Sequence, residues 1–218
     1  MINLEEIFKK LENEKYCVVK TFKLDYKEGS DIDIFCYDLK SFSKKLLYVL
    51  NNLSINNINI KVIYKNDKHW YIDVLQDKKI DIRFDLYGDM PNYKKVLVKD
   101  CLFSSIIENC IVNEINSIKI KQPCLIDDVI LRYLEYIENY ELRPDKIKHL
   151  DYIVSKIENN EKLKKEFLNK LHFYTKLPEV LEAQKRKNYL AILKEIISKI
   201  KQTPIKELPK KIMKNIRR

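Results

Sequence analysis

Two aspartates separated by a single residue are the part of the sequence best suited to chemistry. The chain reads Gly-Ser-Asp-Ile-Asp-Ile from Gly29 to Ile34, so that Asp31 and Asp33 alternate with isoleucines. Side chains two residues apart project from the same face of a β-strand, which would place both carboxylates on one surface and both isoleucines in a core. Because Mg²⁺ prefers hard oxygen ligands and commonly takes one or two carboxylates plus substrate phosphates, this segment predicts a divalent-metal site.

A second acidic strand is expected further along the chain. From Lys79 to Tyr87 apolar and polar residues alternate, and the odd positions carry Asp81, Arg83 and Asp85. A third carboxylate would complete a site for two metal ions about 3.5–4 Å apart, and an arginine on the same face suits phosphate. Alternating acids also occur on the solvated face of a half-buried sheet, but two such strands, one of them preceded by Gly-Ser, favour a site. The residues alone leave Asp73 and Asp85 open beside Asp81.

The elements that must position these strands follow from apolar spacing and turn residues. Asp38 is suited to cap a helix, and Pro144 suits the first turn of another. Three strand-like runs separated by short polar turns predict an antiparallel meander. The predicted elements, in chain order, are a helix at 4–11, strands at 16–24 and 31–37, a helix after Asp38, strands at 58–64, 69–75 and 79–87, and helices at 127–140, 144–157, 162–174 and 178–201.

This order of elements divides the chain into an α+β part and a helical part. We expect an α+β domain over residues 1–120, with short mixed elements in its last third. A helical domain over 121–202 and a basic tail over 203–218 complete the chain. The metal-binding strands both belong to the first domain.

Composition excludes several classes of protein. Only two glycines occur, so the glycine-rich phosphate loops of P-loop and dinucleotide-binding folds cannot be built. The five cysteines form no C-x-x-C pair, which argues against a disulfide framework or a structural zinc site. No run approaches the ~18–20 apolar residues of a membrane span, and acids among the first 14 residues do not fit a signal peptide. We expect a cytoplasmic protein.

The net charge of +10 is concentrated at the end of the chain. The segment from Lys201 to Arg218 holds seven basic residues and the single acid Glu207. The remainder of the chain is only modestly basic, which makes nucleic acid a less favoured partner than a small molecule. The basic tail also carries apolar residues, so it is suited to touch the anionic inner face of a membrane or to dock on a partner protein.

These motifs resemble those of a known superfamily. The segment from Gly29 to Ile34 resembles the G-S-D-x-D-hydrophobic signature of the nucleotidyltransferases, which have the DNA polymerase β-like fold. Lys79–Arg83 is similar to the strand that bears the third metal carboxylate of that superfamily. A looser resemblance extends through Arg143–Leu150 to the helical part of bacterial nucleotidyltransferase-like proteins associated with surface-polysaccharide genes. The resemblance implies an α+β fold, with a mixed sheet and flanking helices, followed by an α-helical C-terminal domain.

The resemblance also implies which residues bind the metal. Asp31 and Asp33 match the paired ligands, and Asp81 matches the third ligand, with Asp85 as the alternative. The three matched aspartates would be the catalytic residues, and the metal would be Mg²⁺ or Mn²⁺.

The phosphate-binding residues of the superfamily have only a partial match. Its first strand usually ends in Gly-Gly or Gly-Ser about ten residues before the paired aspartates, and this chain has Lys20 and Thr21 there. We expect Lys20 to contact phosphate and Thr21 to replace the serine hydroxyl, while Ser30 and Arg83 orient the phosphate.

Three functions are compatible with these features. The first is a Mg²⁺-dependent nucleotidyltransferase that moves a nucleoside monophosphate from an NTP to a small acceptor, such as a sugar or a cell-envelope precursor. The second is a binding or regulatory protein that keeps the fold without turnover, which the replaced glycines suggest. The third is an RNA- or tRNA-modifying nucleotidyltransferase whose basic tail contacts the nucleic-acid backbone.

Overall fold

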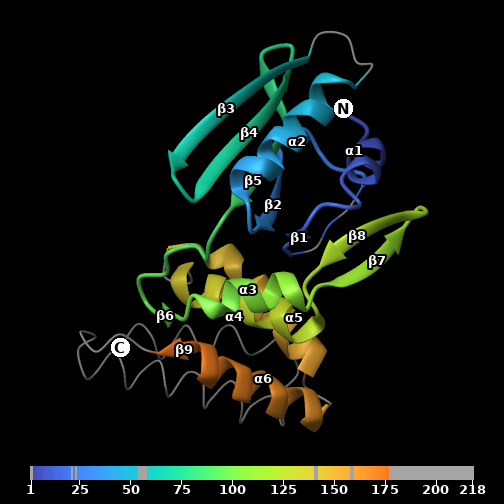
Figure 1. Cartoon of the computed structure of the whole chain (residues 1–218). Coiled ribbons are helices and arrows are strands. Elements are labelled where there is room, and N and C mark those ends of the chain that lie inside the picture. The colour runs from blue at the N-terminus through green and yellow to red at the C-terminus, as the bar shows by residue number, and fades with distance from the viewer. Residues whose placement is uncertain are drawn as a thin grey trace. The chain divides into compact units, whose positions relative to one another are not determined.

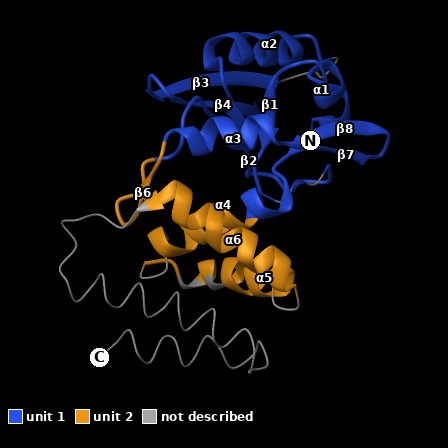
Figure 2. Ribbon diagram, turned by 60° about the horizontal axis from the view of Figure 1, so that its bottom comes forward, with its two compact units in different colours: residues 1–91, 100–128 blue, residues 92–99, 129–218 orange. Residues whose placement is uncertain are grey.

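The computed structural model describes most of the chain as two compact units, shown in different colours in Figure 2. Unit 1 comprises Met1–Pro91 and Asp100–Asp128, and unit 2 comprises Asn92–Lys99 and Val129–Arg218. The residues that the structure describes are 2–20, 22, 24–53, 58–139, 142–157 and 160–176. Thr21, the predicted helix at 178–201 and the basic tail at 203–218 lie outside them.

Unit 1 is an α+β unit built on a mixed five-stranded sheet (Figure 1). Its strand order is β1-β2-β5-β4-β3. β2 and β5 run parallel, and every other neighbouring pair is antiparallel. The bounds are β1 Tyr16–Val18, β2 Ser30–Cys36, β3 Ile58–Asn66, β4 His69–Gln76 and β5 Lys79–Tyr87. The predicted antiparallel meander of the last three strands is confirmed.

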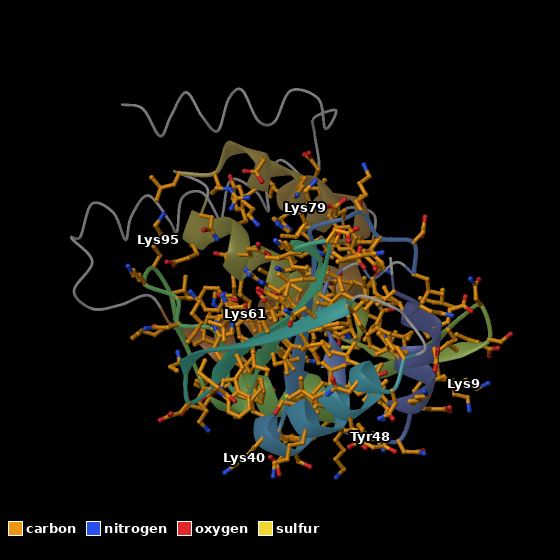
Figure 3. All side chains as sticks on the ribbon, turned by 90° about the horizontal axis from the view of Figure 1, so that it is seen from above. Lys9, Lys40, Tyr48, Lys61, Lys79 and Lys95 are labelled. Atoms are coloured by element: carbon orange, nitrogen blue, oxygen red, sulfur yellow. The ribbon has the colours of Figure 1, made fainter. Side chains whose placement is uncertain are left out.

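Two helices cover one face of this sheet and form the main core. α1 (Leu4–Lys10) and α2 (Leu39–Asn51) pack on the alternate apolar residues of the strands. The predicted cap of α2 is confirmed, because the Asp38 side chain accepts a hydrogen bond from the amide of Ser41 at 2.8 Å. The residues of β2, β4 and β5 in this core are Ile32, Ile34, Cys36, Ile72, Val74, Ile82, Phe84 and Leu86. Lys40 and Tyr48, both exposed, mark the outer side of α2 (Figure 3).

The remaining elements of unit 1 are a short helix and a hairpin. They are α3 (Cys101–Glu108), β7 (Ile111–Ile115) and β8 (Ile118–Gln122). β8 packs against β1 and α1, and Lys121 at its end donates hydrogen bonds to the carbonyls of Glu12 and Glu14 at 2.9 and 2.5 Å. The hairpin therefore fixes the turn between α1 and β1.

Unit 2 is mainly helical. Its elements are β6 (Leu97–Val98), most of α4 (Leu125–Asn139), the 3-10 turn η1 (Pro144–Lys146), α5 (Ile147–Ile157), α6 (Glu161–Tyr174) and β9 (Thr175–Lys176). As the apolar spacing predicts, Leu150, Ile153 and Ile157 are buried. In the ranges that the structure describes, no helix is long and apolar enough to cross a membrane.

Candidate metal centre

Five polar residues of β2, β4 and β5 lie on the face of the sheet away from α1 and α2, which we call the site face. It is defined by Asp31, Asp33, Asp73, Arg83 and Asp85. The strand register aligns these residues in rows across the sheet. Asp31, Arg83 and Asp73 form one row, and Asp33 lies directly opposite Asp85 in the next. The alternation on β2 and β5 that fills the core with apolar side chains thus gathers the acids on the other surface.

Three of these acids form a group that can hold a metal ion. One carboxylate oxygen from each of Asp31, Asp33 and Asp85 lies within 4.8 Å of the other two. Asp85 is 9% exposed, and its Oδ1 atom has no hydrogen-bond partner among the described residues. Three carboxylates that offer hard oxygen donors, one of them buried and with an unsatisfied oxygen, fit the ligand preference of Mg²⁺ or Mn²⁺.

Burial and like charge act together on Asp85. Burial is the larger cause, and the nearby carboxylates of Asp33 and Asp31 add to it, so the pKa of Asp85 rises to about 7. Like charges directly opposite one another on neighbouring strands destabilise a sheet. A cation at this position would therefore relieve an electrostatic cost that the fold carries.

Lys20 supplies one such cation from within the chain. Its Nζ atom lies 2.7 Å from Oδ2 of Asp33, whose side chain is 12% exposed. The backbone of Lys20 has φ +69°, a left-handed conformation that glycine adopts readily and other residues rarely do. This turn ends β1 at Val18, so the strand is shorter than the predicted run to residue 24. The sequence predicted a phosphate contact for Lys20, and in the structure its ammonium pairs with a carboxylate of the triad.

Asp81, the third ligand that the resemblance favoured, lies outside this group. Val74 of β4 pairs with Ile82 while Leu75 pairs with Ile80, so Asp81 is the extra residue of a β-bulge. Bulges re-aim side chains relative to the regular alternation. The Asp81 carboxylate accepts hydrogen bonds from the Tyr26 hydroxyl at 2.5 Å and from the Ile2 amide at 3.1 Å. The structure therefore brings Asp85, the alternative that the sequence left open, together with Asp31 and Asp33 in place of Asp81.

Arg83 lies on the site face but is held by another acid. Its Nε and Nη2 atoms donate to the two oxygens of Asp73 at 2.6 and 2.9 Å, and its guanidinium lies over the ring of Tyr71. The hydrogen bond to Asp73 raises the pKa of Arg83. Asp73 is thus engaged as the counter-ion of Arg83, and this rigid pair borders the acidic triad.

Gly29 and Ser30 build the turn that leads into β2. Gly29 has φ +79°, and nothing lies within 4 Å of the position of an added Cβ, so its backbone conformation and not space requires glycine. The hydroxyl of Ser30 accepts a hydrogen bond from the Lys27 amide at 3.2 Å, and the Gly29 amide donates to the Asp81 carbonyl at 2.8 Å. These bonds set where β2 begins and hence where Asp31 lies.

Sequence reasoning missed the partners that sort these acids. Neither the pairing of Tyr26 with Asp81 nor that of Asp73 with Arg83 has a local signal, because the partners are separated by 55 and 10 residues. Thr21, the other predicted phosphate residue, lies outside the described residues.

A scan against protein-family models finds no match to the chain, and searches of curated proteins and of solved structures find none either.

Proposed function

We propose that this protein is a Mg²⁺-dependent nucleotidyltransferase that moves a nucleoside monophosphate from an NTP to a hydroxyl group of a small acceptor. The observation that carries the proposal is the triad of Asp31, Asp33 and Asp85, with one oxygen of Asp85 buried and unpartnered. The G-S-D-x-D motif at Gly29–Ile34, which resembles the signature of the polymerase β-like nucleotidyltransferases, supports it. The parallel pairing of β2 with β5 inside a mixed sheet is in keeping with that fold.

In this proposal the three carboxylates hold the metal, and the basic residues around them bind phosphate. Mg²⁺, when bound, would neutralise charge on the phosphate oxygens and lower the pKa of the acceptor hydroxyl. Lys20 and Arg83 flank the triad and attract the anionic triphosphate, while the Ser30 hydroxyl can donate to it. Because Arg83 is fixed by Asp73, it acts as a pre-positioned charge.

The transfer itself is one displacement at phosphorus. The acceptor oxygen attacks the α-phosphorus, the bond from that phosphorus to the bridging oxygen breaks, and pyrophosphate leaves. The Asp85 carboxylate lies beside the reacting groups in this proposal and would receive the proton of the acceptor hydroxyl. The catalytic contribution of the chain is positioning and charge neutralisation.

A small acceptor agrees with the charge distribution better than a long nucleic acid does. Most of the excess positive charge belongs to the segment from Lys201 to Arg218, which lies outside the described residues. The site face itself carries more acids than bases among its defining residues. A sugar or a cell-envelope precursor remains our proposed acceptor, and the RNA- or tRNA-modifying alternative rests on the tail alone.

Thermal unfolding with each NTP, with and without Mg²⁺ or Mn²⁺, tests the proposal. We expect the cognate NTP to stabilise the chain only when the metal is present, by about 2.7 kcal/mol at a concentration of 100 Kd. Asp31→Asn/Asp33→Asn should lose this effect. Asp67→Asn, an exposed acid in the turn between β3 and β4, is the matched control and should keep it. Stabilisation that is independent of metal, or equal in all three proteins, would contradict the proposal.

A nucleotide-binding protein without turnover is the second candidate, and Lys20 is the observation that favours it. A lysine paired with Asp33 stands where the superfamily usually has glycine. Metal-dependent stabilisation by an NTP without pyrophosphate release, across a panel of sugar acceptors, would favour this candidate over the transferase.

A further inference from the structure

The turn at Lys20 is held in place from both sides. The Val19 amide donates to the Asp33 carbonyl at 3.0 Å, which ties the turn to β2. The side chain of Gln122, on β8, donates to the Lys20 carbonyl at 3.4 Å and accepts from Asn113 at 2.7 Å. A non-glycine residue in a left-handed conformation persists only where its surroundings determine it. The backbone position from which the Lys20 side chain extends is therefore determined by contacts within unit 1.

The ammonium group of Lys20 takes a place that a second metal ion would need. A carboxylate that bridges two metal ions uses one oxygen for each ion, and Oδ2 of Asp33 is already engaged by Nζ of Lys20 at 2.7 Å. A divalent ion on the same oxygen would lie close to the ammonium, and the two positive charges would repel each other. Asp31, Asp33 and Asp85 each bring one carboxylate oxygen within 4.8 Å of the other two, which defines one oxygen-rich position.

We propose that the centre binds one divalent ion and that the Lys20 ammonium acts as its second cation. The inference rests on the proposed metal site, and it assigns that site a stoichiometry and Lys20 a role. Charge balance supports it, since one divalent ion and one ammonium neutralise the three carboxylates of the triad. Lys20 then neutralises Asp33 before nucleotide binds and meets the triphosphate afterwards.

Counting bound Mn²⁺ tests this directly and needs no activity. Wild-type protein is titrated with Mn²⁺, and the free ion is measured by electron paramagnetic resonance. Lys20→Met removes the charge and keeps an unbranched side chain, whereas Lys20→Arg keeps the charge. Lys61→Met is the matched control, because Lys61 is an exposed lysine of β3 (labelled in Figure 3) that is not part of the triad or its ion pairs. Circular dichroism checks that each variant is folded.

We expect one Mn²⁺ per chain in the wild type, in Lys20→Arg and in Lys61→Met. Lys20→Met should bind a second Mn²⁺, or bind the first at least tenfold more tightly, because the competing charge is gone. Two ions in the wild type, or a Lys20→Met protein that matches the wild type in number and affinity, would overturn the inference.

The same titrations distinguish a wrong metal site from a wrong role for Lys20. If neither the wild type nor Lys20→Met binds more Mn²⁺ than Asp31→Asn/Asp33→Asn does, the proposed metal site is wrong, and the role of Lys20 is overturned with it. If the triad binds Mn²⁺ and Lys20→Met binds the same number of ions with the same affinity as the wild type, the proposed function stands and the role assigned to Lys20 is wrong.

Discussion

Two aspartates of the same strand have opposite surroundings. Asp81 and Asp85 lie four residues apart on β5, and a regular strand would place both on the site face. Asp81 is 3% exposed and has its Oδ2 atom hydrogen-bonded to a tyrosine hydroxyl and a backbone amide. Asp85 is also buried, but one of its oxygens has no partner and two other carboxylates lie beside it. Burial therefore does not distinguish Asp81 from Asp85, whereas the hydrogen-bond partners and neighbouring charges of the two carboxylates do.

The difference teaches how a buried acid can be assigned a structural or a chemical role. A buried carboxylate whose hydrogen bonds are satisfied stabilises the fold and has little capacity left for a ligand. One that is left unsatisfied beside like charges is costly unless something binds it. Asp81 accepts hydrogen bonds from the Tyr26 hydroxyl and the Ile2 amide, whereas Asp85 has an oxygen without a partner among the described residues that can bind a cation or a proton.

Metal affinity should show the largest difference between the two positions. Asp85→Asn replaces a ligand of the triad by a neutral amide and should weaken Mn²⁺ binding by about 100-fold or more, since even outer-shell losses reach that range. Asp81→Asn should leave the affinity unchanged within about twofold, because the Asp81 carboxylate is hydrogen-bonded to Tyr26 and Ile2 and lies outside the triad. Calorimetric titration of both variants with Mn²⁺ measures this.

The reverse result would break the comparison. If Asp81→Asn lost the metal and Asp85→Asn kept it, the bulge on β5 would not separate the two acids, and Asp81 would be the third ligand that the superfamily resemblance implied.

Stability of the metal-free protein should show the opposite order, with a smaller effect. Asp81→Ala leaves the Tyr26 hydroxyl without its acceptor and removes one of the two acceptors of the Ile2 amide, which also donates to the Tyr26 oxygen at 2.6 Å. This should lower the free energy of unfolding by about 1–3 kcal/mol. Asp85→Ala removes a buried charge that faces Asp33 and should not destabilise comparably. Urea unfolding in the presence of a chelator measures both changes, and equal losses would mean that Asp85 has a structural partner as well.

Much of unit 1 could be predicted from the sequence because its signals are local. The alternation on β2 and on β5, the polar turns of the meander and the Asp38 cap each depend on a few neighbouring residues. The end of β1 could not be predicted, because it depends on the backbone conformation of Lys20, which residues far along the chain support.

The sequence was sufficient to predict which strands carry the candidate site, but not which acid of β5 belongs to it. Residue alternation brought Asp31 and Asp33 to one face, and that follows from the period of a strand. The choice between Asp81 and Asp85 needed the bulge, which shows no signature in a run that alternates without interruption from Lys79 to Tyr87. The odd or even position of a residue in a strand predicts which face its side chain lies on only where the strand pairing has no bulge.

The pH dependence of stability should also separate the two acids, as a shift in Tm. Asp85 has a folded-state pKa of about 7 against an ordinary value of 3.8, so the folded chain holds a proton that the unfolded chain has released between these values. Metal-free wild type should therefore lose stability as pH rises from about 4 to about 7, and no further above that. Burial, followed by Asp33 and Asp31, raises this pKa, and Arg83 and Lys20 lower it. Asp85→Asn should remove this part of the pH profile and Asp81→Asn should keep it; thermal melts across this range with a chelator present would refute the assignment if the two variants changed alike.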